Sequence, residues 1–82
     1  MSASRKKNDV DTSTYEGRFA VRLTELRTKA KLSVDDLAEI TGIDRSVIYH
    51  WEAATKTPTI SRFPILAKAL GLKNIQKLLP EE

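Results

Sequence analysis

The sequence contains no cysteine and only one histidine, His50, among its 82 residues. Disulfides and thiolate metal sites are therefore excluded, and one histidine cannot assemble a zinc site alone. No nucleophile is arranged around His50 in the sequence, so an acid–base role for it has nothing to support it. We expect a protein that is not an enzyme and that uses no metal or cofactor.

Long apolar runs are absent as well. No stretch approaches the roughly 20 apolar residues that span a bilayer, and residues 1–10 are polar where a signal peptide would be apolar. A cytoplasmic protein without membrane contact is the expectation. Fourteen Lys and Arg against eleven Asp and Glu leave a net charge of +3. This charge is compatible with a polyanionic partner, but it is also common among domains that bind none.

The length allows one domain, and the composition divides the chain near residue 13. Residues 1–13 carry basic residues at 5–7 and acidic residues at 9 and 11, with almost nothing apolar. We expect a flexible N-terminal arm, which could follow DNA electrostatically or be simply solvated. Residues 14–80 are the predicted folded domain, whose core must be well patterned because so short a chain buries only about 60 % of its unfolded surface.

The spacing of apolar residues predicts helices in the first half of this domain. One apolar residue recurs every three or four positions, which predicts a first helix over about 14–30. The residues of this face are Tyr15, Phe19, Leu23, Leu26 and Ala30. Ser33 stands three positions before Asp36, the spacing of a capping box, and predicts a second helix over about 34–41.

A tight turn and a third helix follow. Glycine enters the left-handed conformation freely, so Gly42 is expected to end the second helix, and Asp44 can cap the next one. The third helix is predicted from Arg45 to about Ala53. It turns Ile48 and Trp51 to one side, and its other side carries polar residues. These polar residues are Arg45, Ser46, Tyr49 and His50.

The last part of the chain predicts a loop and two more helices. Residues 55–61 lack periodicity and include Pro58, which is typical of a loop. A fourth helix follows, with apolar positions Phe63, Leu66, Ala67 and Leu70. With Ser61 as its N-cap, Pro64 falls in the first turn, where no N–H is needed. Asn74 can start a short fifth helix over 75–79, which Pro80 stops. The sequence thus predicts an all-α fold, a compact bundle of about five helices.

The second and third predicted helices meet the steric requirements of a helix-turn-helix. Leu37 supplies an apolar anchor, and Ala38 leaves space for the next helix to cross closely at a steep angle. Gly42 makes the turn and Ile43 fills its underside. Ile48 and Trp51 then fix the third helix on the core, and it is the combination of residues at these spacings that carries the argument.

Several stretches of this sequence resemble the lambda-repressor-like or Cro/XRE class of helix-turn-helix DNA-binding domains. The resemblance covers about residues 19–72 and rests on the segments 23–27, 32–38, 42–44, 51–52 and 64–71. It implies a five-helix bundle whose third helix, about 45–53, enters the major groove of double-stranded DNA. It also implies a structural salt bridge between Arg27 of the first helix and Glu52 of the third.

Two positions depart from the pattern of that class. Val34 stands where a glutamine commonly touches the DNA backbone, although the start of the second helix, at Ser33, can still offer N–H groups to a phosphate. Ala54 stands where glycine is favoured after the recognition helix. An alanine forced into the left-handed conformation costs roughly 1 kcal/mol or more. We therefore expect the loop 53–60, with Lys56 as its phosphate-binding candidate, to follow a different path.

The polar face of the third helix suits direct contact with bases. Arg45 can donate two hydrogen bonds to guanine, Ser46 can donate or accept, and Val47 can lie against a thymine methyl group. Tyr49 and His50, one turn further on, could reach bases or phosphates. The alternative is that all of these are solvated surface residues. The sequence predicts sequence-specific binding of double-stranded DNA by a transcriptional regulator, a repressor, with no small-molecule substrate.

The fifth helix carries many apolar residues for a segment so close to the end of the sequence. Some could complete the core of the monomer, and the rest could form a homodimer interface, for which the candidates are Ile75, Leu78 and Leu79. Ile40, expected to point outward, is another candidate contact. These residues also support a second hypothesis, a protein-interaction module such as an antitoxin or adaptor built on the same fold.

Overall fold

The computed structural model describes residues 10–79, and all its regular elements are helical. Residues 1–9 of the predicted arm at 1–13 and the stop at Pro80 lie outside the described residues. The α-helices in chain order are α1 (Tyr15–Lys29), α2 (Val34–Thr41), α3 (Arg45–Glu52) and α4 (Phe63–Ala69). Two 3-10 turns, η2 (Ile60–Arg62) and η3 (Ile75–Leu78), precede and follow α4. The predicted all-α class is confirmed.

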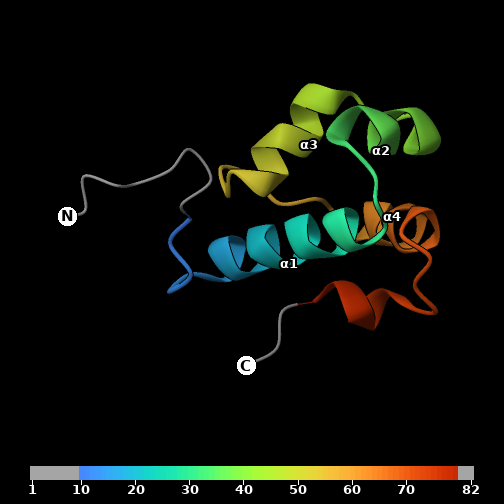
Figure 1. Ribbon diagram of the computed structural model, residues 1–82. Helices are drawn as coiled ribbons and strands as arrows, with labels where there is room; N and C mark the ends of the chain where they lie inside the picture. The colour runs from blue at the N-terminus through green and yellow to red at the C-terminus, as the bar shows by residue number, and fades with distance from the viewer. Residues whose placement is uncertain (1–9, 80–82) are drawn as a thin grey trace.

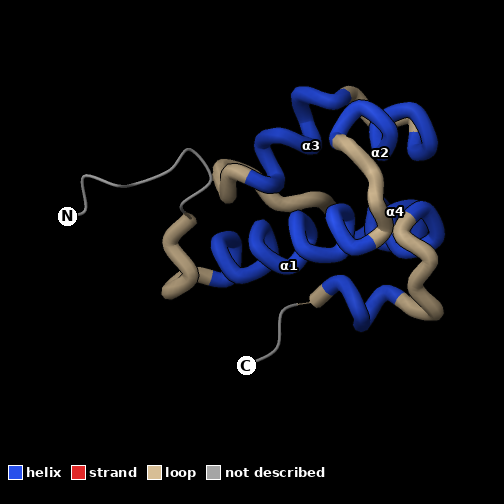
Figure 2. The backbone as a smooth tube through the Cα atoms, in the orientation of Figure 1, coloured by secondary structure: helices blue, strands red, loops and turns tan. Residues whose placement is uncertain are grey.

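The helices are arranged around α1, which is the longest of the four (Figure 1). The α2–α3 pair lies on one side of α1 and η3 on the other, while α4 crosses at the end where α1 finishes (Figures 1 and 2). Helix α1 contacts both α3 and η3, and α4 contacts α2 and η3. The α2–α3 pair is therefore supported from below by α1 and at one end by α4.

The core lies where these elements meet. Its largest fully buried side chains come from every α-helix and from η3: Phe19, Leu23, Leu37, Ile48, Leu66 and Leu78. The rings of Phe19 and Phe63 are nearly parallel, at 6°, with centroids 5.9 Å apart, so α1 and α4 are joined by an aromatic stack. No helix within residues 10–79 is long and apolar enough to cross a membrane.

The helix boundaries follow the capping residues closely. Thr14 caps α1, since its Oγ1 accepts a hydrogen bond from the Gly17 amide at 3.0 Å. Ser33 and Asp36 form the predicted capping box at α2. Gly42 has a φ of 76°, in the left-handed region, and ends α2 as expected. Local sequence signals thus set the start of α1 and both ends of α2, the first helix of the predicted helix-turn-helix.

The N-terminal end of the described chain turns back over α1, which the sequence did not indicate. Thr14 Oγ1 donates to the Asp11 carbonyl at 3.1 Å, and Arg18 Nη1 donates to the Thr12 carbonyl at 3.2 Å. A side chain at Gly17 would place its Cβ 1.7 Å from the Asp11 carbonyl oxygen. Gly17 is therefore the residue that allows the turn at 11–14 to lie against the helix.

Several predicted boundaries are wrong towards the C-terminus. The residue before α4 is Arg62 rather than Ser61, which lies within η2, although Pro64 does fall in the first turn. The fifth helix starts after Asn74 as predicted but is a 3-10 turn that ends at Leu78. By contrast, α3 ends at Glu52 with Ala53 as its C-cap, in agreement with the predicted end at about Ala53. The segment at 75–78 forms a 3-10 turn because the four residues between its N-cap Asn74 and its C-cap Leu79 are too few for a stable α-helix.

Leu78 corrects the predicted dimer interface. Its side chain is 0 % exposed within the single chain, since η3 folds back onto α1 and α4. Ile75 and Leu79 pack against the same core and keep part of their surface exposed. Leu78 therefore completes the monomer core and is not part of any outer surface.

Candidate nucleic-acid interface

The turn between α2 and α3 is fixed by hydrogen bonds as well as by Gly42. The Gly42 amide donates to the Ala38 carbonyl at 2.8 Å. The hydroxyl of Thr41, which is buried, donates to the Leu37 carbonyl at 2.7 Å and accepts from the Ile43 amide at 3.2 Å. Sequence analysis did not single out Thr41, which satisfies a backbone donor inside the turn and so helps set the path into α3.

Helix α3 has a buried side and an exposed side, as predicted. Ile48 and Trp51 lie in the core, and Ala38 packs against it from α2. The exposed residues are Arg45, Ser46, Tyr49 and His50. Val47 is half-buried and rests partly on the core, so it presents less of its surface than these four. The structure therefore brings the predicted polar residues together on one outward face.

Arg45 points outward but is not isolated. Its Nη1 lies 3.1 Å from Oδ1 of Asp35, at the start of α2, and each side chain is 64 % exposed. The hydrogen bond from Arg45 to Asp35, together with the negative charge of that carboxylate, raises the pKa of the Arg45 guanidinium above its usual value. The guanidinium thus stays charged at any working pH, and this pair joins the first turns of both helices.

Asp44 caps α3 and also binds its second residue. One carboxylate oxygen accepts from the Ser46 amide and from the Ser46 hydroxyl, both at 2.8 Å. These two hydrogen bonds, the backbone bond first, lower the pKa of the Asp44 carboxyl. Because the Ser46 hydroxyl proton is directed at Asp44, the Ser46 oxygen faces a ligand as an acceptor.

His50 is held by Thr55, which lies three residues after the end of α3. Thr55 Oγ1 donates to the His50 backbone carbonyl at 3.1 Å and lies 3.0 Å from His50 Nδ1. These two contacts hold the Nδ1 side of the ring against Thr55. The other ring nitrogen, Nε2, has no hydrogen bond within the described part of the chain and is left for a ligand.

The start of α2 is the second candidate contact region. Ser33 Oγ accepts from the Asp36 amide at 2.9 Å, and Asp36 Oδ2 accepts from the Ser33 amide at 3.0 Å. Hydrogen bonds to the Asp36 carboxylate, first from the Ser33 backbone and then from the Ser33 side chain, lower the pKa of the Asp36 carboxyl. Val34 is buried and belongs to the core. The residue that replaces the expected glutamine therefore contributes packing, and Ser33 is the polar group that stays at the surface.

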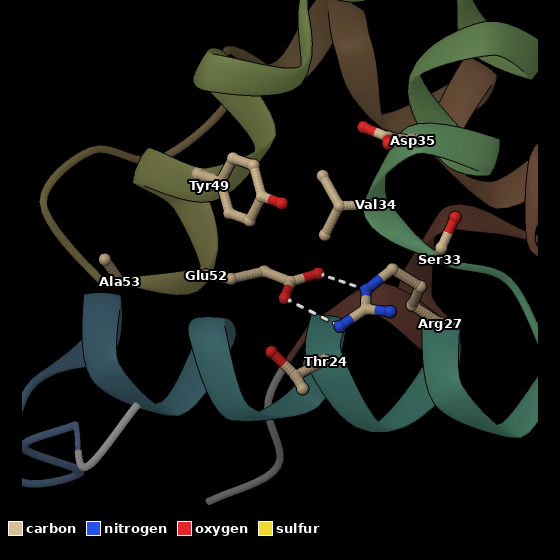
Figure 3. Close-up of a pocket in the computed structure, with 8 residues that line it drawn as sticks. All are labelled: Thr24, Arg27, Ser33, Val34, Asp35, Tyr49, Glu52 and Ala53. Atoms are coloured by element: carbon tan, nitrogen blue, oxygen red, sulfur yellow. Dashed lines mark hydrogen bonds and ion pairs between the residues drawn. The ribbon is translucent and has the colours of Figure 1, made fainter. Parts of the chain in front are cut away.

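Arg27 and Glu52 form the salt bridge implied by the family resemblance (Figure 3). Arg27 Nε lies 2.7 Å from Glu52 Oε2, and Nη2 lies 3.1 Å from Oε1, while Nη1 donates to the Leu32 carbonyl at 2.8 Å. The side chains are only 17 % and 12 % exposed. One guanidinium thereby ties α1 to the end of α3 and to the chain segment that enters α2.

The salt bridge lies beside a pocket of about 430 Å³ between α1, the start of α2 and the last turn of α3. In Figure 3, the ring of Tyr49 lies across this pocket from Val34, and Ser33 and Asp35 stand at its α2 side. Thr24 and Ala53 complete the wall. Tyr49, which is 54 % exposed, therefore has Val34 as an apolar neighbour on the face that also carries Arg45.

The loop after α3 does not avoid the left-handed conformation at Ala54. Ala54 has a φ of 64°, and the Thr55 amide donates to the His50 carbonyl at 3.0 Å. The expectation that an alanine here would exclude this conformation is wrong, because the hydrogen bonds that close the helix end offset its strain. Lys56 follows in the exposed part of the loop.

Comparison with known sequences agrees with this geometry. A sequence model of the helix-turn-helix family matches residues 23–78, which include α2, the turn and α3. The chain belongs to the helix-turn-helix family. Within it, the resemblance to the Cro/XRE class is confirmed, since the structural neighbours are transcription regulators. This family consists of DNA-binding regulators rather than enzymes, and double-stranded DNA is the partner that such a domain implies.

Three solved structures of helix-turn-helix proteins are similar to this chain. The restriction-modification controller protein C.AhdI from Aeromonas hydrophila is 34 % identical, with a TM-score of 0.71, over 76 % of this chain and 92 % of that one. The hypothetical transcription factor NHTF from Neisseria is 27 % identical, with a TM-score of 0.73, over 85 % and 80 %.

The third structure is an HTH_3 family transcriptional regulator from Vibrio cholerae. It is 25 % identical, with a TM-score of 0.71, over 78 % of this chain and 35 % of that one. A search among curated protein sequences gave no match. The agreement in fold therefore extends over most of the described helices, including the α2–α3 unit.

Proposed function

We propose that this chain is a sequence-specific double-stranded DNA-binding regulator, a repressor, that places α3 in the major groove. The observation that carries the proposal is the outward polar face of α3 on a helix-turn-helix unit braced by the Arg27–Glu52 pair. The transcription regulators among its structural neighbours support the same conclusion. The protein would act by binding alone.

The proposal gives each exposed residue of α3 a role. Arg45 donates to guanine O6 and N7, and the Ser46 oxygen accepts from a base amine. The exposed part of Val47 lies against a thymine methyl group. Tyr49 and His50, one turn further along, contact bases or phosphates, and His50 does so through Nε2.

The surrounding backbone would hold the phosphates. The hydroxyl of Ser33 is exposed at the start of α2, and on binding it would donate to a phosphate oxygen in place of its contact with the Asp36 carboxylate. Lys56 is exposed in the loop after α3 and supplies a cation. These contacts position the protein on the duplex and carry no sequence information, whereas the α3 contacts do.

Two copies of the chain would bind together on a two-fold symmetric site. Dimers of this geometry contact half-sites about 34 Å apart, which increases both affinity and specificity. Ile75 and Leu79 are the apolar residues near the C-terminus that keep exposed surface, and we propose that they contribute to this interface. Sedimentation with and without the selected duplex tests it, and a complex of one chain per duplex would contradict it.

Selection from a random pool of duplexes, at several salt concentrations, tests the function itself. The wild-type chain should enrich one sequence, and Arg45→Ala should lose about 1–3 kcal/mol of binding free energy at that site. Lys73→Ala is the matched control, because Lys73 is an exposed cation in the connection between α4 and η3, away from α3. Absence of any enriched sequence, or equal effects of both substitutions, would contradict the proposal.

A protein-interaction module is the second candidate, and exposed apolar side chains favour it. Ile60 is 74 % exposed on η2, and Ile40 is exposed at the end of α2. Isolated apolar residues at a surface are ordinary, so they weigh less than the α3 face. Binding to DNA without sequence preference, combined with a stoichiometric protein complex lost on Ile60→Ser, would favour this candidate over the first.

A further inference from the structure

The Asp35–Arg45 pair has no evident role in stabilising the fold. It is single-bonded, at 3.1 Å, and both side chains are 64 % exposed, and such surface pairs contribute little to folding stability. Arg45 is also the first residue of α3, the end of a helix where a positive charge is unfavourable. An arginine in this place needs a reason other than the stability of the helix.

The pair leaves the guanidinium able to bind a base. Only Nη1 is bonded to Asp35, and no other hydrogen bond of this guanidinium occurs within residues 10–79. The Nε and Nη2 groups therefore keep donors for the two acceptors of a guanine edge. Because Asp35 belongs to α2, it fixes the guanidinium relative to the neighbouring helix and limits the conformations that a free arginine would sample.

The carboxylate also changes how this site interacts with phosphates. An arginine without a partner is attracted to any phosphate, which increases binding to every sequence equally. A carboxylate 3.1 Å away offsets that charge and repels phosphate oxygens. The donors aimed at a base edge are retained, so the pair favours a guanine over a phosphate as the partner of Arg45.

We propose that Asp35 is a specificity-determining residue of this regulator, which positions Arg45 for a guanine edge and weakens its binding to phosphates. This inference rests on the proposed function. Asp35 acts through Arg45, so its effect should be confined to the base pair that Arg45 contacts and should vanish when Arg45 is absent.

The chain offers a matched control on the same helix. Glu39 is an exposed carboxylate one turn after Asp35 and has no hydrogen bond to Arg45. Asp35→Ala and Glu39→Ala each remove one negative charge from α2, but only the first removes the partner of Arg45. Asp36 is unsuitable as a control because it closes the capping box with Ser33.

The experiment measures binding of four variants to three kinds of duplex by salt-titrated fluorescence anisotropy. The variants are Asp35→Ala, Glu39→Ala, Arg45→Ala and the double variant Asp35→Ala/Arg45→Ala. The duplexes are the site selected by the wild-type chain, versions of it with each guanine replaced in turn, and one unrelated sequence. Thermal unfolding of every variant verifies that the fold is retained, and Asp35→Asn is a second substitution at the same position.

We expect Asp35→Ala to reduce discrimination at one guanine position by about tenfold, a large part of what a bidentate arginine provides. Asp35→Ala and Glu39→Ala should both bind the unrelated duplex more tightly than wild type, and Glu39→Ala should keep the discrimination of the wild type. The double variant should discriminate no less than Arg45→Ala alone. Asp35→Asn, which keeps an acceptor oxygen, should restore part of the discrimination.

The outcomes separate this inference from the proposed function. Equal changes at matched and replaced sites for Asp35→Ala, as for Glu39→Ala, would overturn the role of Asp35 while leaving the proposed function intact. An Arg45→Ala variant that selects the same site with unchanged discrimination would instead overturn the assignment of Arg45, and the role of Asp35 with it.

Discussion

Arg27 on α1 donates two hydrogen bonds to the Glu52 carboxylate at the end of α3, at 2.7 and 3.1 Å, and a third to the Leu32 carbonyl at 2.8 Å. The distance between α1 and α3 is thus determined by a side-chain pair as well as by apolar packing. Since α3 carries the exposed polar face, the orientation of that face depends on a residue that is itself remote from it.

Removal of Arg27 should therefore destabilise the protein noticeably. We expect Arg27→Ala to lower the free energy of unfolding by about 2 kcal/mol, because a carboxylate that is mostly shielded from water loses charged hydrogen bonds. Urea unfolding measures this loss. The double variant Arg27→Ala/Glu52→Ala should lose less free energy of unfolding than the two single variants lose when added together.

Lys29→Ala is the control for Arg27, since Lys29 is an exposed cation on the last turn of the same helix. Its effect should stay within about 0.5 kcal/mol. Additive single and double variants at Arg27 and Glu52 would show that the pair contributes no coupling energy.

Acid should weaken the start of α2 through Asp36. The hydrogen bonds from Ser33 lower the pKa of Asp36 in the folded state, so this carboxylate stabilises the fold at pH values above its unfolded pKa. That contribution is lost as the pH falls through the lower, folded pKa. Urea midpoints between pH 7 and pH 2 should show a decrease that is smaller in Asp36→Asn. A parallel decrease in both proteins would contradict the cap assignment.

Ala54→Gly should stabilise the protein. The residue has a φ of 64°, and replacing alanine by glycine in the left-handed region should gain about 0.5–1 kcal/mol after the entropy of glycine is subtracted. Ala53→Gly is the matched control, because Ala53 has a φ of −91° and gains nothing from glycine. Thermal unfolding of both should give shifts of opposite sign; a lower Tm for Ala54→Gly would be inconsistent with strain at this residue.

Leu78→Ala tests whether η3 belongs to the monomer core. Because the side chain is fully buried, its truncation should cost about 2–5 kcal/mol, at every protein concentration. Leu79→Ala, at a residue that keeps exposed surface, should cost clearly less. A loss for Leu78→Ala that disappears at low protein concentration would instead place this residue in an interface between chains.

The sequence predicted α2 to the residue, since Ser33, Asp36 and Gly42 are local signals at both of its ends. It predicted a short helix at 75–79 but not that Leu78 is buried in the monomer, because apolar spacing cannot distinguish a segment that completes a core from one that meets a partner. The contact of Gly17 with the turn at Asp11 was equally invisible, since a glycine within a helical pattern gives no sign of what approaches it.

The candidate site also contains features that the sequence predicted and contacts that it did not. The residues of the outward α3 face follow from helical periodicity, and the Arg27–Glu52 pair from the family resemblance. The Asp35–Arg45 contact, between residues ten positions apart, could not be predicted from spacing because it depends on how α2 and α3 cross in space. The role of Thr41 inside the turn depends on the same geometry.

Trp51 is the single tryptophan of the chain and is only 3 % exposed, on the side of α3 opposite to Arg45. Its fluorescence therefore provides an optical signal, without any dye, for whether this helix is docked on the rest of the molecule. A ligand on the outer face of α3 lies away from the indole ring and should alter its emission little. A single fluorescence sample can thus distinguish a variant that has lost its fold from one that has lost only its affinity for a ligand on α3.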